Sequence, residues 1–400
     1  MLRRNRADGA LSPSMSKGGR AAVARSRSID HQLDEERERR EKEVQILILG
    51  SPGVGKSTFI KQMRLHYGDG FPPSERQHFH QQILQNIATG LVHLMEHMDH
   101  VGVQFASPET EVLASEFMKK HPRISLVTLM KKFKEADDQA EEMCPATTRA
   151  ELTKRLSSLN IFSPEIPCIS DMHTLWADPA ILACFEKRHT FESDQLASNT
   201  EYFLLHIGRI CSPDYLASVQ DILHIRWPTL GVQEHQFSVG SRLYRMIDVA
   251  GQRSLRKKWI HFFTEVTAVA FFVSLTAFDE TLEEEPTVNS LQDSLQAFNE
   301  VSHNQFLEKT DFILFLNKKD LFANKLKSSS LSACFPEYQS GADTDSCLKY
   351  IRDQFADNKP TNKHMYTHFC CAINIPLMKD LLACVIDLII DINIKKSSHT

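Results

Sequence analysis

A short glycine-rich segment that ends in a lysine and two hydroxyl residues is where the residue types first suggest chemistry. Residues 50–58 read GSPGVGKST and fit the pattern G-x-x-x-x-G-K-[ST]. In that pattern the backbone N–H groups of a tight turn surround a phosphate chain at the start of a helix. The apolar run at residues 44–49 and the helical run at residues 59–65 supply the strand and the helix that such a turn needs. The segment is therefore predicted to be a phosphate-binding P-loop.

Two side chains of this loop have roles that follow from their chemistry. Lys56 is expected to neutralise the β- and γ-phosphates, and the Ser57 hydroxyl is expected to ligate Mg²⁺. Further contacts to the nucleotide are predicted at Gly50, Gly53, Val54, Gly55 and Thr58.

Two later segments indicate which base the bound nucleotide carries. Asn317, Lys318 and Asp320 form N-K-x-D after the apolar run FILFL. A carboxylate such as Asp320 accepts hydrogen bonds from guanine N1–H and its 2-amino group, which adenine does not offer in this form. We expect Asn317 to tie this loop to the P-loop and the Lys318 stem to lie over the base. In HFCCA, at residues 368–372, Cys371 and Ala372 are small enough for a backbone N–H to reach guanine O6.

Residues that would sense the third phosphate lie between these motifs. Asp248, Gly251 and Gln252 match D-x-x-G-Q after an apolar run, and Arg226 and Thr229 lie in RWPT upstream. Asp248 is expected to hold Mg²⁺ through water, and Thr229 to complete the Mg²⁺ shell when the third phosphate is present. The Gly251 N–H would contact the γ-phosphate. Gln252 would orient the attacking water, and Arg226 would spread charge from the transition state.

Composition sets the frame for these motifs. The chain has 400 residues, 42% of them hydrophobic, which is enough for a large core in two domains or in one domain with a big insertion. A net charge of −5 gives no support for nucleic-acid binding. The nine cysteines show no CxxC or zinc spacing, which is typical of a reduced intracellular chain. No apolar run reaches transmembrane length.

The pattern along the chain divides it into three parts. Residues 1–43 are predicted to be a mobile basic tail followed by an exposed helix. Residues 44–70 and 215–400 alternate apolar strand-like runs with helical stretches, which favours an α/β domain with a mostly parallel sheet and helices on both faces. Residues 71–214 carry helical periodicity and are expected to form an inserted all-α domain.

Long stretches of this amino-acid sequence resemble the α subunits of heterotrimeric G proteins. The shared segments include GKSTFIKQMR, IDVAGQRSLRKKWIHFF, ILFLNKKDLF and YTHFCCA, and the likeness extends from residue 25 to about residue 395. It is weakest at residues 100–170, where this chain is longer than is usual in the family.

The resemblance implies a Ras-like P-loop GTPase domain with a helical domain lying over the nucleotide. It also implies GTP and GDP as bound nucleotides, with Mg²⁺ as cofactor, and a GTPase activity. The implied partners are a βγ dimer, a seven-helix receptor, an effector protein and an RGS-type regulator. The implied location is the cytoplasm, peripheral at the plasma membrane.

Several residues depart from the family's pattern. Gly53 replaces the acidic residue that usually pairs with the arginine, and Pro52 fixes φ beside the γ-phosphate. Arg226 is therefore expected to be less well held and hydrolysis to be slow. The resemblance also implies two switch segments, the first around residues 226–231 and the second around residues 248–262. In the second switch Leu255 replaces an acidic residue, and Ser198 stands where an aspartate often clasps the two domains.

Both ends of the chain also differ from the family. Leu2 replaces the glycine needed for N-myristoylation, and no cysteine precedes Cys144, so neither usual lipidation signal is present at the N-terminus. The C-terminal KKSSHT lacks the paired apolar residues that usually dock into a receptor, and Ser397 stands where some members have a modified cysteine.

Three alternatives follow from the residues. One is a GTP-binding interaction module that hydrolyses little or no GTP, motivated by Pro52 and Gly53. Another is an ATP-using P-loop enzyme, which Asn317 and Asp320 disfavour. The third arises from HLMEH at residues 93–97, which matches the zinc pattern H-x-x-E-H. No third ligand accompanies that segment, so His93 and His97 are expected to be ordinary exposed histidines.

Overall fold

The computed structural model describes residues 43–123, 166–188 and 198–397, apart from Leu230, Glu265 and Ser340, together with a few isolated positions between these ranges. The predicted basic tail and N-terminal helix therefore lie outside the described residues, except for Glu43. Of the helices described, none is both long enough and apolar enough to cross a membrane.

Six strands form one sheet, in the order β2-β3-β1-β4-β5-β6. Only the β2–β3 pair is antiparallel. Every residue of β4 is buried, as expected for a central parallel strand that is covered on both faces. The bounds are β1 (Glu43–Gly50), β2 (Val232–Val239), β3 (Arg242–Val249), β4 (Ala268–Ser274), β5 (Asp311–Asn317) and β6 (Met365–Phe369).

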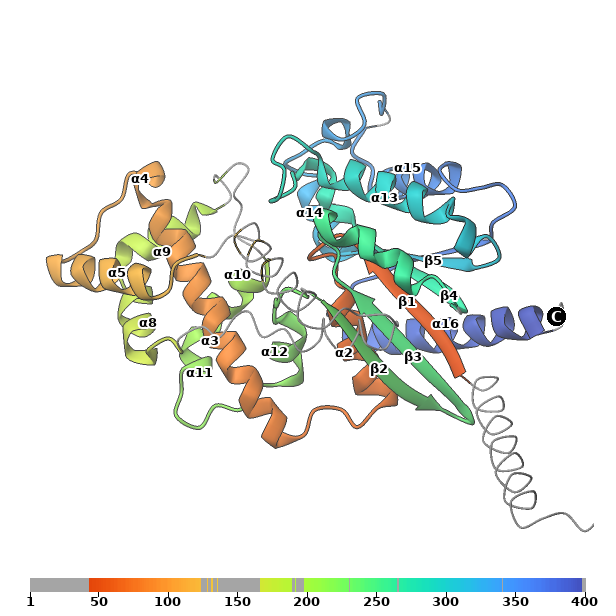
Figure 1. Cartoon of the computed structure of the whole chain (residues 1–400). Coiled ribbons are helices and arrows are strands. Elements are labelled where there is room, and N and C mark those ends of the chain that lie inside the picture. Colours follow the sequence, from red (N-terminus) through yellow and green to blue (C-terminus); the bar gives the residue numbers. More distant parts are fainter. Residues whose placement is uncertain are drawn as a thin grey trace, which may run out of the picture.

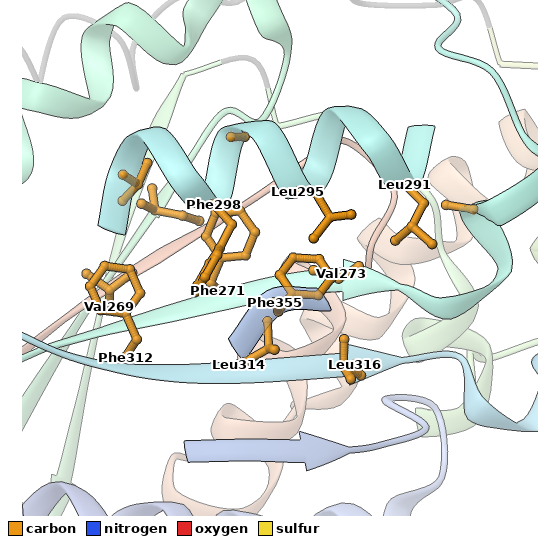
Figure 2. Close-up of a cluster of buried hydrophobic side chains, with 14 of the residues drawn as sticks. Val269, Phe271, Val273, Leu291, Leu295, Phe298, Phe312, Leu314, Leu316 and Phe355 are labelled. Carbon is orange, nitrogen blue, oxygen red and sulfur yellow. The ribbon is translucent and has the colours of Figure 1, made fainter. Parts of the chain in front are cut away.

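Helices cover both faces of this sheet (Figure 1). Helices α2 (Lys56–Tyr67) and α16 (Ile375–Ser397) pack on one face around Phe59, Phe272 and Phe315. The other face carries α13 (Ser290–Ser302), α15 (Thr344–Asp357) and the 3₁₀ segment η2 (Arg253–Phe262). Figure 2 shows Phe298 of α13 among the aromatic rings of this second core. Shorter elements complete this part of the chain: α14 (Lys319–Lys325), η3 (Leu275–Asp279), η4 (Gln305–Leu307) and η5 (Leu331–Ala333).

A separate hydrophobic core lies among helices that follow α2 in the chain. Its long helix α3 supplies Ile83, Ile87, Leu91 and Leu94 at helical spacing, and all four are fully buried. These helices lie beside the sheet, on the side of α2 and β2 (Figure 1). Their bounds are α3 (Pro73–Glu96), α4 (Met98–Val101), α5 (Pro108–Lys120), α8 (Ile169–Trp176), α9 (Pro179–Glu186), α10 (Ser198–Leu205), α11 (Ile207–Ile210) and α12 (Val219–His224).

The predicted fold class is confirmed, because a mostly parallel sheet with helices on both faces is accompanied by an all-helical insertion. The sequence did not single out β2, the antiparallel edge strand. Its residues VQEHQFSV are polar enough to read as a loop, and the strand is held at the edge by its ladder to β3.

Candidate nucleotide and magnesium site

The P-loop connects the end of β1 to the start of α2. Gly50, Gly53 and Gly55 have φ values of 136°, 72° and 107°, in the region that favours glycine. A Cβ on Gly50 would lie 2.2 Å from the Phe272 carbonyl oxygen, and one on Gly55 would lie 2.1 Å from Asn317 Nδ2. The loop is therefore pressed against β4 and against the N-K-x-D segment, and side chains at these two positions would push it away.

Lys56 folds back over this loop. Its Nζ donates to the carbonyl oxygens of Gly50 at 2.7 Å and Ser51 at 3.0 Å. Burial lowers the pKa of Lys56 to about 8, with Asp248 opposing the shift and nearby Arg256 adding to it. A buried ammonium with only carbonyl partners is well placed to gain from an anionic ligand such as a phosphate chain.

Three oxygen-bearing side chains from distant segments meet beside the loop. The Ser57 hydroxyl lies 3.1 Å from the Thr229 hydroxyl and 3.2 Å from Asp248 Oδ2, and Thr229 lies 3.4 Å from the same carboxylate oxygen. Asp248 is fully buried, and its Oδ1 has no hydrogen-bond partner. Hydroxyl and carboxylate oxygens are the ligands that Mg²⁺ prefers, and the unpartnered Oδ1 leaves room for a metal-bound water. The residues present therefore fit a Mg²⁺ site.

We expect Asp248→Asn to weaken Mg²⁺ binding to the nucleotide-loaded chain about 10- to 100-fold, the usual cost of losing an outer-shell carboxylate. The matched control is Asp311→Asn, at the other end of β5 from Asn317. Burial raises the pKa of Asp248 to about 6. Since a proton and Mg²⁺ compete for the same carboxylate, wild-type affinity should also fall below about pH 6. Equal Mg²⁺ dependence of Asp248→Asn and wild type would contradict the assignment.

The second switch segment lies directly on the P-loop. A Cβ on Gly251 would lie 2.2 Å from the Gly50 carbonyl oxygen and 2.7 Å from Lys56 Nζ, so only glycine allows this approach. The next residue, Gln252, is 2% exposed, and its Oε1 is buried without a hydrogen-bond partner. A buried, unpartnered amide oxygen is costly, and a water molecule would satisfy it.

A buried polar network that no sequence motif predicts joins the P-loop to this segment. Arg256 of η2 pairs with Asp293 of α13, and it also donates to the Ser51 hydroxyl and the Gly251 carbonyl. Ser51 lies 3.1 Å from the Ser294 hydroxyl. Arg256 lies within the segment IDVAGQRSLRKKWIHFF, which resembles the G-protein α subunits. No motif marks Asp293, which is 242 residues from Ser51. Leu255 is 7% exposed and part of the core, so its apolar side chain helps to hold this segment against the sheet.

Arg226 is the first residue of the segment 226–231 and is exposed at the rim of the site. Its guanidinium lies 3.8 Å from the point where a Cβ on Gly53 would be. Its charge also lowers the pKa of Lys318, after the larger effect of burial. The structure thus places Arg226 beside Gly53 of the P-loop and near enough to Lys318 of the N-K-x-D segment for its charge to act there. Ser198, by contrast, is exposed at the start of α10, and its hydroxyl forms no hydrogen bond with another described residue.

Asn317 joins the two corners of the site. Its Nδ2 donates to the Val54 carbonyl at 2.8 Å, and its Oδ1 accepts from the Ala372 N–H at 2.9 Å. Lys318 has a φ of 64°, the only positive φ among the described non-glycine residues. This left-handed turn starts α14 and leaves Asp320 exposed in its first turn. Asp320 lies close to the Cys371 thiol, whose pKa is raised to about 12 by burial and by that carboxylate.

The H-x-x-E-H segment differs from expectation in one respect. His97 is half-buried, but His93 is buried at 7% exposure, so the prediction of two exposed histidines was wrong for His93. Both rings lie against Phe191, which covers this face of α3, and Glu96 pairs with Arg123. The part of the chain that the structure describes contains no group of three or more His, Cys, Asp or Glu side chains placed to hold a metal.

Fold and site together define a P-loop nucleotide-binding protein of the Ras-like class with a helical insertion. The profile of the family "G-protein alpha subunit" matches residues 23–389. The chain is 34% identical over 382 residues to the guanine nucleotide-binding protein G(o) subunit alpha of Locusta migratoria, and equally to that of Caenorhabditis elegans. Each alignment covers 95% of this chain and 98% of the relative. The chain belongs to the G-protein α-subunit family, a family of GTP-binding signal transducers.

Proposed function

We propose that this chain is a GTP-hydrolysing signalling switch that cycles between a GDP- and βγ-bound state and a GTP- and effector-bound state, downstream of a seven-helix receptor. The observation that carries the proposal is the meeting of Ser57, Thr229 and Asp248 within 3.4 Å of one another. These residues come from the P-loop and the two switch segments. A ligand bound there contacts all three segments at once, so its loss releases both switches.

The chemistry assigned to the chain's own residues is mainly positioning and charge stabilisation. Lys56 and the P-loop N–H groups hold the phosphates, and the buried Gln252 amide orients the attacking water. Arg226 stabilises charge that develops on the transferred phosphoryl group. Mg²⁺, held by Ser57, Thr229 and, through water, Asp248, would neutralise phosphate charge. The guanine specificity is assigned to Asp320, with Asn317, Lys318, Cys371 and Ala372 around the base.

The proposal includes the domain boundaries of the chain. Residues 44–70 and 215–400 would form the GTPase domain, residues 71–214 the helical domain, and residues 1–43 the basic tail and helix. An RGS-type regulator would act on the switch segments. The location would be the cytoplasmic face of the plasma membrane, with peripheral attachment, and the basic tail would attract anionic lipid.

A second candidate function is a GTP-binding interaction module with little hydrolysis. It is favoured by Gly53, which offers no carboxylate to the Arg226 guanidinium. Members of this family that carry their own arginine hydrolyse GTP at about 10⁻² s⁻¹, which is the reference rate for both candidates.

GTPγS binding by the full chain, with and without βγ, followed by single-turnover release of phosphate from GTP, tests the proposal. We expect about one nucleotide per chain, slower exchange with βγ present, and hydrolysis at or somewhat below the reference rate. Binding without measurable phosphate release would favour the interaction module. Absence of GTPγS binding would contradict both candidates.

A further inference from the structure

A single asparagine of the long helix α3 holds the main chain of the predicted catalytic arginine. The Asn86 amide accepts a hydrogen bond from the Arg226 N–H at 3.0 Å and donates to the Arg226 carbonyl at 3.1 Å. Asn86 is 7% exposed and is 140 residues from Arg226 in the chain. One side chain therefore binds both the main-chain N–H and the main-chain carbonyl of Arg226, as a neighbouring strand would do.

The orientation of this amide is set by its other two partners. Asn86 Nδ2 also donates to the Gln82 carbonyl at 2.9 Å, and Oδ1 also accepts from Asn199 Nδ2 at 2.9 Å. All four hydrogen bonds match donor to acceptor. A flipped amide would place its NH₂ group against the Arg226 N–H and the Asn199 NH₂, and its oxygen against two carbonyls. Asn199 thus keeps the Asn86 amide turned toward Arg226.

Close packing of two helices brings Asn199 to this position. Gly90 lies one turn after Asn86 in α3 and faces α10, where a Cβ would lie 2.1 Å from the Thr200 methyl group. Without a side chain at Gly90, α10 approaches α3 closely enough for the Asn86–Asn199 contact. The clamp on Arg226 is therefore built by the helical core and not by the sheet.

The side chain of Arg226 has no comparable support. Its guanidinium forms no hydrogen bond or ion pair within the part of the chain that the structure describes. It lies over Gly53, which has no side chain to meet it. Among the described residues, the main-chain clamp is therefore the contact that fixes the point from which the guanidinium extends.

We propose that Asn86 is a positioning residue for Arg226, and that Asn199 supports it by orienting its amide. The inference rests on the proposed GTPase function. It assigns to α3 and α10 a share of the hydrolysis rate, through the peptide groups of the arginine and not through contact with the nucleotide.

The test compares single-turnover GTP hydrolysis by the full-length wild type, Asn86→Ala and Asn199→Ala. Displacement of a catalytic group by about 1 Å can cost about 100-fold in rate, so we expect a 10- to 100-fold loss for Asn86→Ala. A smaller loss is expected for Asn199→Ala. GTPγS affinity should stay within about threefold. The control is Thr89→Ala, because Thr89 is exposed on the same helix and its hydroxyl donates to the Gln85 carbonyl within that helix.

A double-mutant comparison separates positioning from a general structural effect. In an Arg226→Ala background, adding Asn86→Ala should change the hydrolysis rate less than about twofold. An equal loss in both backgrounds, or a wild-type rate for Asn86→Ala, overturns the inference while leaving the proposed function in place. If Asn86→Ala does not fold, the inference is tested with Asn199→Ala in the wild-type and Arg226→Ala backgrounds, with the same comparison of hydrolysis rates. A wild type that binds GTPγS without hydrolysing GTP overturns the GTPase proposal itself, and this inference with it.

Discussion

Replacing Gln252 with leucine is expected to leave GTP bound and to slow its hydrolysis by about 100-fold or more. Gln252 is 2% exposed, and its buried Oε1 has no protein partner. Leucine has a similar volume but cannot accept from or donate to water, so the nucleophile loses its orientation while the pocket stays filled. Orientation of a reactant is worth several orders of magnitude in rate, which sets the size of the expected effect.

Single-turnover release of γ-phosphate measures this loss directly, with GTPγS affinity as the check on binding. Lys257→Ala is the matched control, because Lys257 lies in η2, which follows Gln252 directly, and its side chain is exposed. We expect that control to hydrolyse GTP within about twofold of wild type. Wild-type turnover by the Gln252→Leu variant would remove this residue from the mechanism.

Replacing Asp320 with asparagine is expected to reduce the preference for GTP over ATP by about 10²–10⁴-fold. The carboxylate would accept two hydrogen bonds from guanine, and each hydrogen bond to a charged group contributes about 1.5–3 kcal/mol. Asparagine presents an NH₂ group to one of these donors, so one hydrogen bond is replaced by two opposed donors. The phosphate contacts are unchanged, and binding of both nucleotides through the P-loop should persist.

Displacement of bound GTPγS by GTP and by ATP gives this preference for each variant. Lys319→Ala is the control, since Lys319 is exposed and its backbone bond to the Cys370 carbonyl does not involve its side chain. An Asp320→Asn chain that discriminates as well as wild type would show that another group reads the base.

The parts of the site that the sequence predicts are those where one local segment carries the chemistry. GSPGVGKST needs glycine at three positive-φ positions, and the structure has a positive φ at Gly50, Gly53 and Gly55. The apolar runs before Asn317 and Asp248 likewise become β5 and β3, two parallel strands whose carboxyl ends lie on the same side of the sheet. Local pattern and fold agree there because the motif and its strand are contiguous.

The remaining features depend on contacts between segments that carry no motif. Asp293 and Ser51 meet only because α13 packs on the sheet, and Asn86 reaches Arg226 only because α3 passes the start of the first switch. An asparagine in a helix is otherwise expected to be solvated. His93 is buried for a similar reason, since Phe191 from outside α3 covers it. The hydrophobic periodicity of a single helix cannot predict such contacts, because they depend on which other segment packs against it.

Competition for the wild-type nucleotide site tests the central claim most directly. With Mg²⁺ present, the full-length chain is loaded with labelled GTPγS and titrated with unlabelled GTP or ATP. We expect GTP to displace half of the label at about the concentration of the label. ATP in a thousandfold excess should leave most of the label bound, because a site built to hydrogen-bond one base rejects another by about 10⁴-fold or more. Equal displacement by the two nucleotides would contradict the account of a guanine-specific switch.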